Sequence, residues 1–271
     1  MLDKEIRGAG KKRRRRGGSR VRKGVYLLPN IITSLSLFGG FYSIIACLDG
    51  RFERAAIAIL ISAVLDGLDG RVARLTNTSS EFGMQYDSLS DLVAFGIAPG
   101  VLIFTWALQP FGRYGWLAAF LYVVCGALRL ARFNVQSATV ESRTFKGLPI
   151  PAAAVLVAST VLFLFYVGQE EIAKHITVLV MVYSLAYLMV SNVKYYSFKE
   201  LNLSKRMPFR FLVGVILLLI VVAAEPSVMI FVFTLIYVVS GPVMTLVSRR
   251  RGVKVKGEGV EDVGENPEKG V

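Results

Sequence analysis

DGLDGRVARLTNTSSEFGMQYDSLSD, residues 66–91, joins two long apolar runs, Ala55–Leu75 and Phe82–Leu108. A helix that crosses about 30 Å of hydrocarbon needs about 20 residues, and each of the two runs has that length. The stretch between them carries four aspartates, at positions 66, 69, 87 and 91. It therefore predicts a hairpin of two membrane-spanning helices with acidic side chains near the turn.

Apolar runs of similar length recur along the whole 271-residue chain, which is 54% hydrophobic. The further runs are Leu27–Leu48, Trp116–Phe133, Pro151–Val167, Ile176–Asn192, Phe211–Ala224 and Val228–Val247. The first run is kept as a span because it exceeds a normal signal h-region and follows a long basic arm. The sequence thus predicts an all-α, polytopic transmembrane helical bundle of about eight spans, with the membrane domain covering residues 26–248.

The positive charges predict how this bundle is oriented. All but four of the 32 Lys and Arg residues fall on one side of the eight-span arrangement, and the four are Arg51, Arg54, Arg113 and Lys174. Cytoplasmic loops carry the excess of Lys and Arg. We therefore expect a multi-pass protein of the cell (inner or plasma) membrane with both termini cytoplasmic. The acidic stretch faces the cytoplasm in this arrangement.

The two ends of the chain are charged and the cysteines are few. Residues 1–25 form a basic cytoplasmic arm, which beside a span is typical of contact with anionic membrane lipids. No RNA-binding module with interleaved aromatic residues follows it, so no nucleic-acid partner is expected. Residues 249–271 predict a charged, disordered cytoplasmic tail. Cys47 and Cys125 fall inside predicted spans and suit neither a disulfide framework nor a zinc site.

The spacing of the aspartates predicts a metal site. Residues three or four apart share a helix face, so Asp66 pairs with Asp69 and Asp87 with Asp91, and the hairpin brings the pairs together. Carboxylates at a membrane boundary are costly unless they bind a cation. Oxygen ligands without nearby His or Cys suit Mg²⁺ or Mn²⁺, with Ca²⁺ an alternative. Four shared carboxylates fit two ions about 3.5–4 Å apart, an arrangement that clamps a phosphoryl group.

Two glycines and an arginine extend this site toward a nucleotide diphosphate. Gly70 follows Asp69 and lets the backbone approach a ligand closely. At Gly83, one turn before Asp87, a side chain would block the cavity. Arg74 offers a bidentate fork to phosphate. An ion pathway or a structural acidic cluster is the alternative, but it accounts for neither the glycines nor the arginine.

The pattern D-G-x-x-A-R-x8-G-x3-D-x3-D, from Asp69 to Asp91 and preceded by Asp66, resembles the signature of the CDP-alcohol phosphatidyltransferase family. The resemblance implies two metal ions held by the four aspartates, Asp91 also acting as general base, and a homodimer. It implies that the CDP-lipid is bound by Asn30, Thr33, Asp66, Gly70, Ala73, Arg74, Ser80 and Gly83. For Asn30 and Thr33 the alternative is ordinary capping of a helix start.

Further segments resemble a branch of this family, the integral-membrane phosphatidylserine synthases. They are LLPN at 27–30, ALRLARFN at 127–134, FKGLPIP at 145–151 and MVSNVKYYSFK at 189–199. This second resemblance implies CDP-diacylglycerol and L-serine as substrates, with phosphatidylserine and CMP as products.

A physical argument also favours serine as the acceptor. Serine is a zwitterion, so its site needs a cation for the carboxylate. Arg129, Arg132 and Lys146 lie on the side of the aspartates, with Asn134 available as an amide partner, and the two arginines can share a helix face. The alternative is that these cations only obey the positive-inside rule.

Two other functions stay open at this point. A phosphorylated acceptor such as glycerol 3-phosphate or inositol phosphate would need a denser cationic cluster, which Arg129, Arg132, Arg143 and Lys146 could supply; choline is a further acceptor. A cation transporter usually places its site at helix breaks near the bilayer centre. Asp66 and Asp69, however, directly precede the cytoplasmic Arg71 and Arg74.

Overall fold

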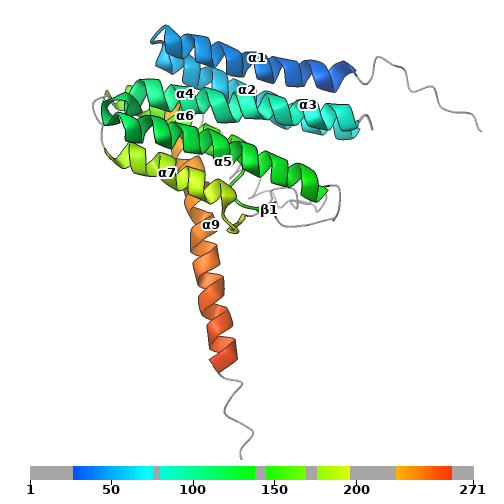
Figure 1. The fold of residues 1–271 in the computed structure, drawn as a ribbon, viewed down its shortest axis with the longest axis vertical. Coiled ribbons are helices and arrows are strands. Elements are labelled where there is room, and N and C mark those ends of the chain that lie inside the picture. The colour runs from blue at the N-terminus through cyan, green and yellow to red at the C-terminus, as the bar shows by residue number, and fades with distance from the viewer. Residues whose placement is uncertain (1–26, 76–79, 138–144, 169–175, 196–223, 258–271) are drawn as a thin grey trace, which may run out of the picture.

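The structure is a computed structural model, and it describes residues 27–75, 80–137, 145–168, 176–195 and 224–257. The main helices are α1 (Leu27–Leu48), α2 (Phe52–Leu75), α5 (Arg113–Ser137), α6 (Ile150–Val167), α7 (Ile176–Val190) and α9 (Pro226–Gly257) (Figure 1). One continuous helix from Glu81 to Phe111 lies between α2 and α5. It is divided into α3 (Glu81–Asp91), η2 (Leu92–Ile97), α4 (Ala98–Ile103), η3 (Phe104–Leu108) and η4 (Gln109–Phe111).

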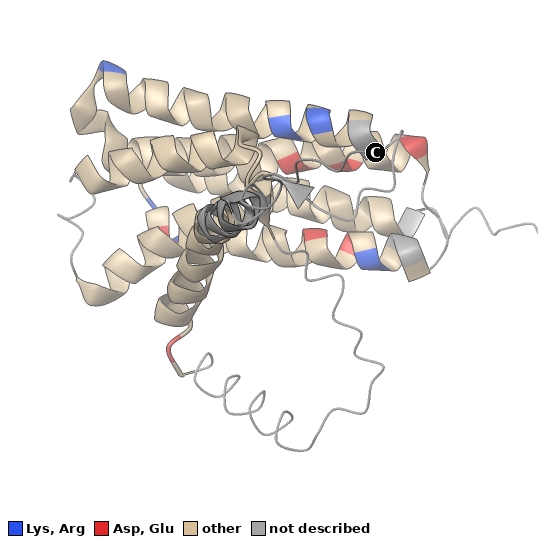
Figure 2. Cartoon of the chain, turned by 90° about the horizontal axis from the view of Figure 1, so that it is seen from below, with Lys and Arg blue, Asp and Glu red and all other residues tan. Residues whose placement is uncertain are grey.

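The described chain is helical apart from one antiparallel bridge, in which β1 (Phe145–Lys146) pairs with β2 (Lys194–Tyr195). Helices of membrane length are present, as predicted. Five are long and apolar enough to cross a membrane: Pro29–Leu48, Glu81–Phe111, Arg113–Val135, Ile150–Val167 and Pro226–Thr245. The apolar helix Ile176–Val190 is shorter, and α2 carries a cluster of charged residues in its second half. Among the residues that the structure describes, most of the charged ones gather in one half of the bundle (Figure 2).

The C-terminal end of the structure bears on two of the sequence predictions. The predicted span Phe211–Ala224 lies almost wholly outside the described residues, so the number of eight spans stays a prediction. The tail was expected to be disordered from residue 249, but α9 continues to Gly257. Arg and Lys are good helix formers, and each added residue of a helix gains a backbone hydrogen bond, so the helix extends past the apolar segment.

Helix α1 is held against α2 and η2 by small residues and hydroxyl groups. A Cβ on Gly40 would lie 2.6 Å from the Cα of Ala94, so the backbones of α1 and η2 nearly touch. Ser36 and Ser62 each donate to the other's backbone carbonyl, at 3.1 and 3.0 Å. Small residues and hydroxyl bonds are how membrane helices associate where water gives no driving force. These contacts place α1 beside both helices that carry the aspartates.

The wide π-turn η2 begins directly after Asp91 and is supported from α5. Pro99 has no N–H, so the carbonyl of Phe95, four residues earlier, lacks its usual α-helical donor. The buried hydroxyl of Tyr122 donates to that carbonyl at 3.1 Å. Unsatisfied backbone groups are costly in a bilayer. This bond therefore fixes the position of α5 along the axis of η2. Turns of this kind inside helices are frequent at functional sites.

Helix α9 crosses the other helices at a steep angle (Figure 1). Its first half packs on α6, where the rings of Phe163 and Phe231 stack with centroids 4.7 Å apart. Further along α9, the ring of Tyr195 from β2 lies against Gly241, at a place where a Cβ would clash with it. Helix α9 therefore approaches the bundle beside the β1–β2 bridge.

Candidate active site

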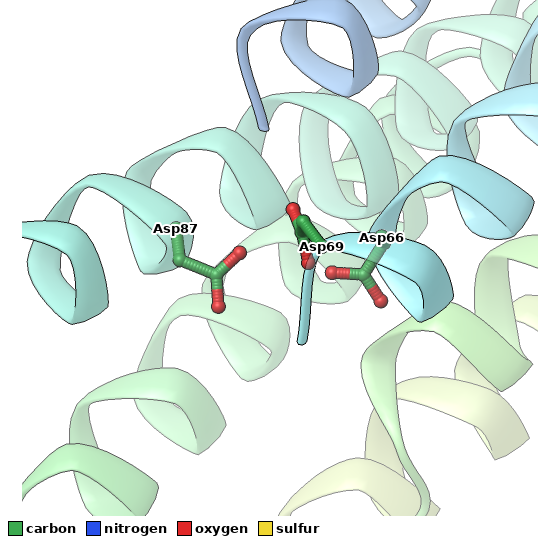
Figure 3. A group of neighbouring side chains, drawn as sticks. All are labelled: Asp66, Asp69 and Asp87. Atoms are coloured by element: carbon green, nitrogen blue, oxygen red, sulfur yellow. The ribbon is translucent and has the colours of Figure 1, made fainter. Parts of the chain in front are cut away.

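The four aspartates of α2 and α3 lie together. One carboxylate oxygen each from Asp66, Asp69 and Asp87 can be chosen so that all three lie within 4.8 Å of one another, and these side chains point toward a common space (Figure 3). The carboxyl group of Asp91 lies within hydrogen-bonding reach of that of Asp66. The i, i+3 and i, i+4 spacings bring each pair to one helix face, and the packing of α2 and α3 beside α1 joins the pairs.

The cluster has the composition of a divalent cation site. Asp69 is 5% exposed, and Oδ1 of Asp87 is buried without a hydrogen-bond partner among the described residues. Where side chains are described, the salt bridge found is Arg51–Asp49, away from the cluster. Buried carboxylates need a compensating cation, and an all-oxygen donor set suits Mg²⁺, Mn²⁺ or Ca²⁺. The residues present therefore fit the predicted metal.

Helix α1 orients one of these carboxylates. The hydroxyl of Thr33 lies 2.9 Å from Oδ2 of Asp69 and 3.0 Å from the carbonyl oxygen of Pro29, and the backbone N–H of Gly70 also bonds to Asp69. Ser90 of α3 donates to the carbonyl of Thr33 at 3.1 Å. Because α1 begins at Leu27, Thr33 lies inside the helix rather than at its cap. The capping alternative is therefore wrong for Thr33.

Three residues of the predicted nucleotide set meet where α3 begins. Ser80 is the N-cap of α3, and its hydroxyl accepts a hydrogen bond from the N–H of Gly83 at 3.0 Å. A Cβ on Gly83 would lie 3.1 Å from Oγ of Ser80 and 3.5 Å from Oδ1 of Asn30. Asn30 also lies inside α1, so the capping alternative is wrong for it too. Contact of this group with a nucleotide stays a prediction.

The last predicted nucleotide residues sit on α2. Gly70 is exposed directly beside Asp69. Ala73 and Arg74 belong to the final turn of α2, and their side chains are outside what the structure describes.

The residues predicted to bind serine separate into two groups. Arg129 lies on α5 close enough to Asp91 to interact with it electrostatically, and its Nε is buried without a hydrogen-bond partner among the described residues. Arg132 instead donates to Oδ1 of Asn192 at 3.1 Å.

Asn134 contacts α3. Its amide donates to Oγ of Ser88 at 3.0 Å. Tyr122 and Asn134 precede and follow Arg129 on α5, and their bonds to Phe95 and Ser88 hold α5 against the helix that carries Asp91. Arg129 is thereby held close to Asp91. Lys146 is in β1, and its side chain is not described.

The family model for CDP-alcohol phosphatidyltransferases matches residues 26–190, a region that contains the whole aspartate cluster. The chain belongs to the CDP-alcohol phosphatidyltransferase family. This phosphatidyltransferase-family chain is 40% identical over 221 residues to a CDP-diacylglycerol–serine O-phosphatidyltransferase of Helicobacter pylori, an alignment that covers 80% of this chain and 90% of that protein.

Two further relatives of this family member carry related names. It is 41% identical over 170 residues to the archaetidylserine synthase of Methanothermobacter thermautotrophicus, which covers 62% of this chain and 69% of the relative. It is 42% identical over 146 residues to a CDP-diacylglycerol–serine O-phosphatidyltransferase of Saccharomyces cerevisiae, with 48% and 51% covered.

Two tyrosines near the site of this phosphatidyltransferase lie beyond the residues that the family model matches, and sequence analysis missed them. Tyr195 is 4% exposed, and its ring centroid is 5.6 Å from that of Tyr237 on α9. Tyr237 is in turn close enough to Arg129 for an electrostatic interaction. We call Arg129, Tyr195 and Tyr237 the α5–α9 wall. Two sequence signals could have pointed to them. Tyr195 lies in the segment 189–199, which resembles the phosphatidylserine synthase branch, and Tyr237 interrupts the apolar run Val228–Val247.

Proposed function

We propose that this chain transfers the phosphatidyl group from CDP-diacylglycerol to the hydroxyl of L-serine, giving phosphatidylserine and CMP. The observation that carries the proposal is the gathering of Asp66, Asp69, Asp87 and Asp91 in a chain 40% identical, over 80% of its length, to a protein named for this reaction. The other relatives described above also have serine in their names, which supports serine as the acceptor.

The proposed substrate arrangement follows from the placement of the site. The acyl chains of CDP-diacylglycerol lie in the bilayer, and its diphosphate lies at the aspartates. Asn30, Ser80 and Gly83 border the nucleotide, together with Gly70 and the last turn of α2. Serine enters from the cytoplasm on the side of Arg129.

The reaction is a displacement at the lipid-linked phosphorus. The serine hydroxyl oxygen forms the new bond to phosphorus, and Asp91 accepts the hydroxyl proton. The bond between that phosphorus and the bridging oxygen of the diphosphate breaks, and the oxygen leaves with CMP. A positioned general base contributes about 10²–10⁴-fold. Asp66, Asp69, Asp87 and Asp91 would hold two divalent ions, Mg²⁺ or Mn²⁺ with Ca²⁺ as the alternative, which neutralise charge on the diphosphate and the departing CMP.

The direct test is release of CMP by the purified full-length protein. CDP-diacylglycerol is offered with L-serine, glycerol 3-phosphate, inositol phosphate or choline in turn, and we expect release with L-serine alone. EDTA should abolish release, and Mg²⁺ or Mn²⁺ should restore it. Release with another acceptor but not with serine would refute the assignment, as would metal-dependent cation flux in proteoliposomes without any CMP. Donors with acyl and with isoprenoid chains are compared, because one relative is named for archaetidylserine.

The proposal includes eight spans, cytoplasmic termini, an active site on the cytoplasmic face of the cell membrane, and a homodimer. The distribution of Lys and Arg supports the orientation. Glu53 and Glu81 are both exposed, at opposite ends of the α2–α3 hairpin. In intact cells, a membrane-impermeant thiol reagent should label a Glu53→Cys variant and spare Glu81→Cys. Labelling of Glu81→Cys and not of Glu53→Cys would show that the topology is the opposite of the proposed one.

A further inference from the structure

Resting on the proposed function, we propose that Tyr237 of α9 binds the carboxylate of the acceptor together with Arg129, and that Tyr195 positions Tyr237. The α5–α9 wall would thereby set the preference for an amino-acid acceptor. The inference adds α9, outside the region matched by the family model, to the site.

Arg129 has the features of a cation prepared for an anionic ligand. Its Nε is buried and has no hydrogen-bond partner among the described residues, and a buried donor without an acceptor is costly. A guanidinium presents a planar fork that matches a carboxylate. The aspartates repel an acceptor carboxylate, so a cation beside Asp91 is needed to hold the acceptor while its hydroxyl approaches that base.

Among the other predicted cations, Arg132 is already used. Its guanidinium donates to Asn192 at 3.1 Å, which ties α5 to the end of α7. Of these two arginines, Arg129 is the one with a buried donor left for a ligand near Asp91. This distinction separates two side chains that are three residues apart and equivalent by sequence spacing.

Tyr237 of α9 lies close to Arg129. It packs partly buried against the core and interacts electrostatically with Arg129. A phenol is a neutral donor, so it can add a hydrogen bond to a carboxylate held by Arg129 without adding charge next to the aspartates. An acceptor without a carboxylate gains nothing from this pair.

Tyr195 fixes where Tyr237 stands. Its hydroxyl donates to the carbonyl of Val238 at 3.2 Å, on the residue after Tyr237. Its ring fills the space left by Gly241 one turn further on. The strand that carries Tyr195 is itself anchored, because the N–H of Gly147 donates to the carbonyl of Val193 at 2.8 Å. Tyr195 thus docks α9 onto the β1–β2 bridge.

The test uses purified full-length protein and measures KM for L-serine, KM for CDP-diacylglycerol, and the inhibition constant of L-alanine. L-Alanine keeps the carboxylate and ammonium of serine but has no hydroxyl, so it reports binding without chemistry. Tyr237→Phe is expected to raise the serine KM and the alanine inhibition constant together by about tenfold, the loss of one hydrogen bond to a charged group. The KM for CDP-diacylglycerol should stay unchanged. Tyr187→Phe is the matched control, because Tyr187 is 73% exposed on α7.

Two further variants keep the inference falsifiable if Tyr237→Phe does not fold. Arg129→Lys retains the charge and loses the planar fork, so the same two constants should rise. Tyr195→Ala should raise them as well, and Tyr195→Phe, which keeps the ring against Gly241, should restore most of the serine affinity.

The inference is overturned if Tyr237→Phe leaves both serine constants unchanged or raises the CDP-diacylglycerol KM equally. Failure of the proposed function is distinct, because it appears in the wild-type protein as no CMP release with L-serine. That result would overturn the inference as well.

Discussion

The aspartate cluster and the α5–α9 wall approach each other at Asp91 and Arg129 but are built in different ways. The cluster comes from two helices that follow each other in the chain, and regular spacing sets each pair on one helix face. The wall comes from three distant segments, α5, β2 and α9, joined by contacts such as that of Tyr195 with Val238.

This difference indicates which residues of the molecule serve mainly function and which also serve stability. The cluster concentrates like charges, so its carboxylates oppose folding until a cation binds. The wall consists of packed rings and an arginine, so its residues also hold helices together. Changes in the cluster should therefore affect turnover without loss of the fold, and changes to the packing that supports either region should affect stability first.

The largest effect is expected for Asp91→Asn. Loss of the base should lower CMP release by about 10²–10⁴-fold. The thermal midpoint in detergent should not fall, since one of several repelling carboxylates becomes neutral. Asp49→Asn, at an exposed position paired with Arg51, is the control and should retain activity. Near-normal turnover of Asp91→Asn would contradict the role of Asp91 as the base, and with it the functional distinction between the cluster and the wall.

Thr33→Val tests whether α1 tunes the cluster. The change removes the hydroxyl that lies 2.9 Å from Asp69, and loss of such a partner typically costs about 10–100-fold in metal affinity or activity. The Mg²⁺ or Mn²⁺ concentration for half-maximal CMP release should rise accordingly. Thr160→Val is matched, because Thr160 also bonds a carbonyl four residues earlier, at 2.7 Å, but in α6. An unchanged metal dependence would show that α1 contributes packing alone.

Gly40→Ala should break the packing that supports the cluster. The new Cβ would lie 2.6 Å from the Cα of Ala94, and backbone cannot yield as a flexible side chain can. Overpacking of this kind costs about 1–3 kcal/mol, measured as the free energy of unfolding in detergent. Gly67→Ala, with nothing within 4 Å of its Cβ, should be neutral or gain up to about 1 kcal/mol from helix propensity. Equal stability of the two variants would contradict the close approach of α1 and η2.

The smallest effect is expected for Tyr122→Phe, which tests the contact between α5, which carries Arg129, and η2, which follows Asp91. It leaves the Phe95 carbonyl without the hydroxyl at 3.1 Å and should cost about 1 kcal/mol of unfolding free energy. CMP release should change little, because Tyr122 is fully buried between helices. The exposed Tyr187→Phe serves again as control. A large loss of serine affinity with full stability would mean that Tyr122 acts on the site directly.

Much of the helical framework follows from the sequence. The predicted run Leu27–Leu48 coincides with α1, and Ala55–Leu75 lies within α2, because a helix in hydrocarbon must satisfy its own backbone and so spans the apolar run. The π-turn η2 was not predictable in this way. It depends on Pro99 together with a donor from α5, and apolar periodicity reports neither.

By itself, the sequence determined that four carboxylates gather at one end of a helical hairpin, since helix periodicity and chain continuity leave two consecutive helices little choice. Only the tertiary structure decided that Arg129 rather than Arg132 faces Asp91, and that Tyr237 from α9 stands beside it. Two arginines three residues apart are equivalent by spacing, and the partner of a side chain on a distant helix is set by packing geometry that no local pattern encodes.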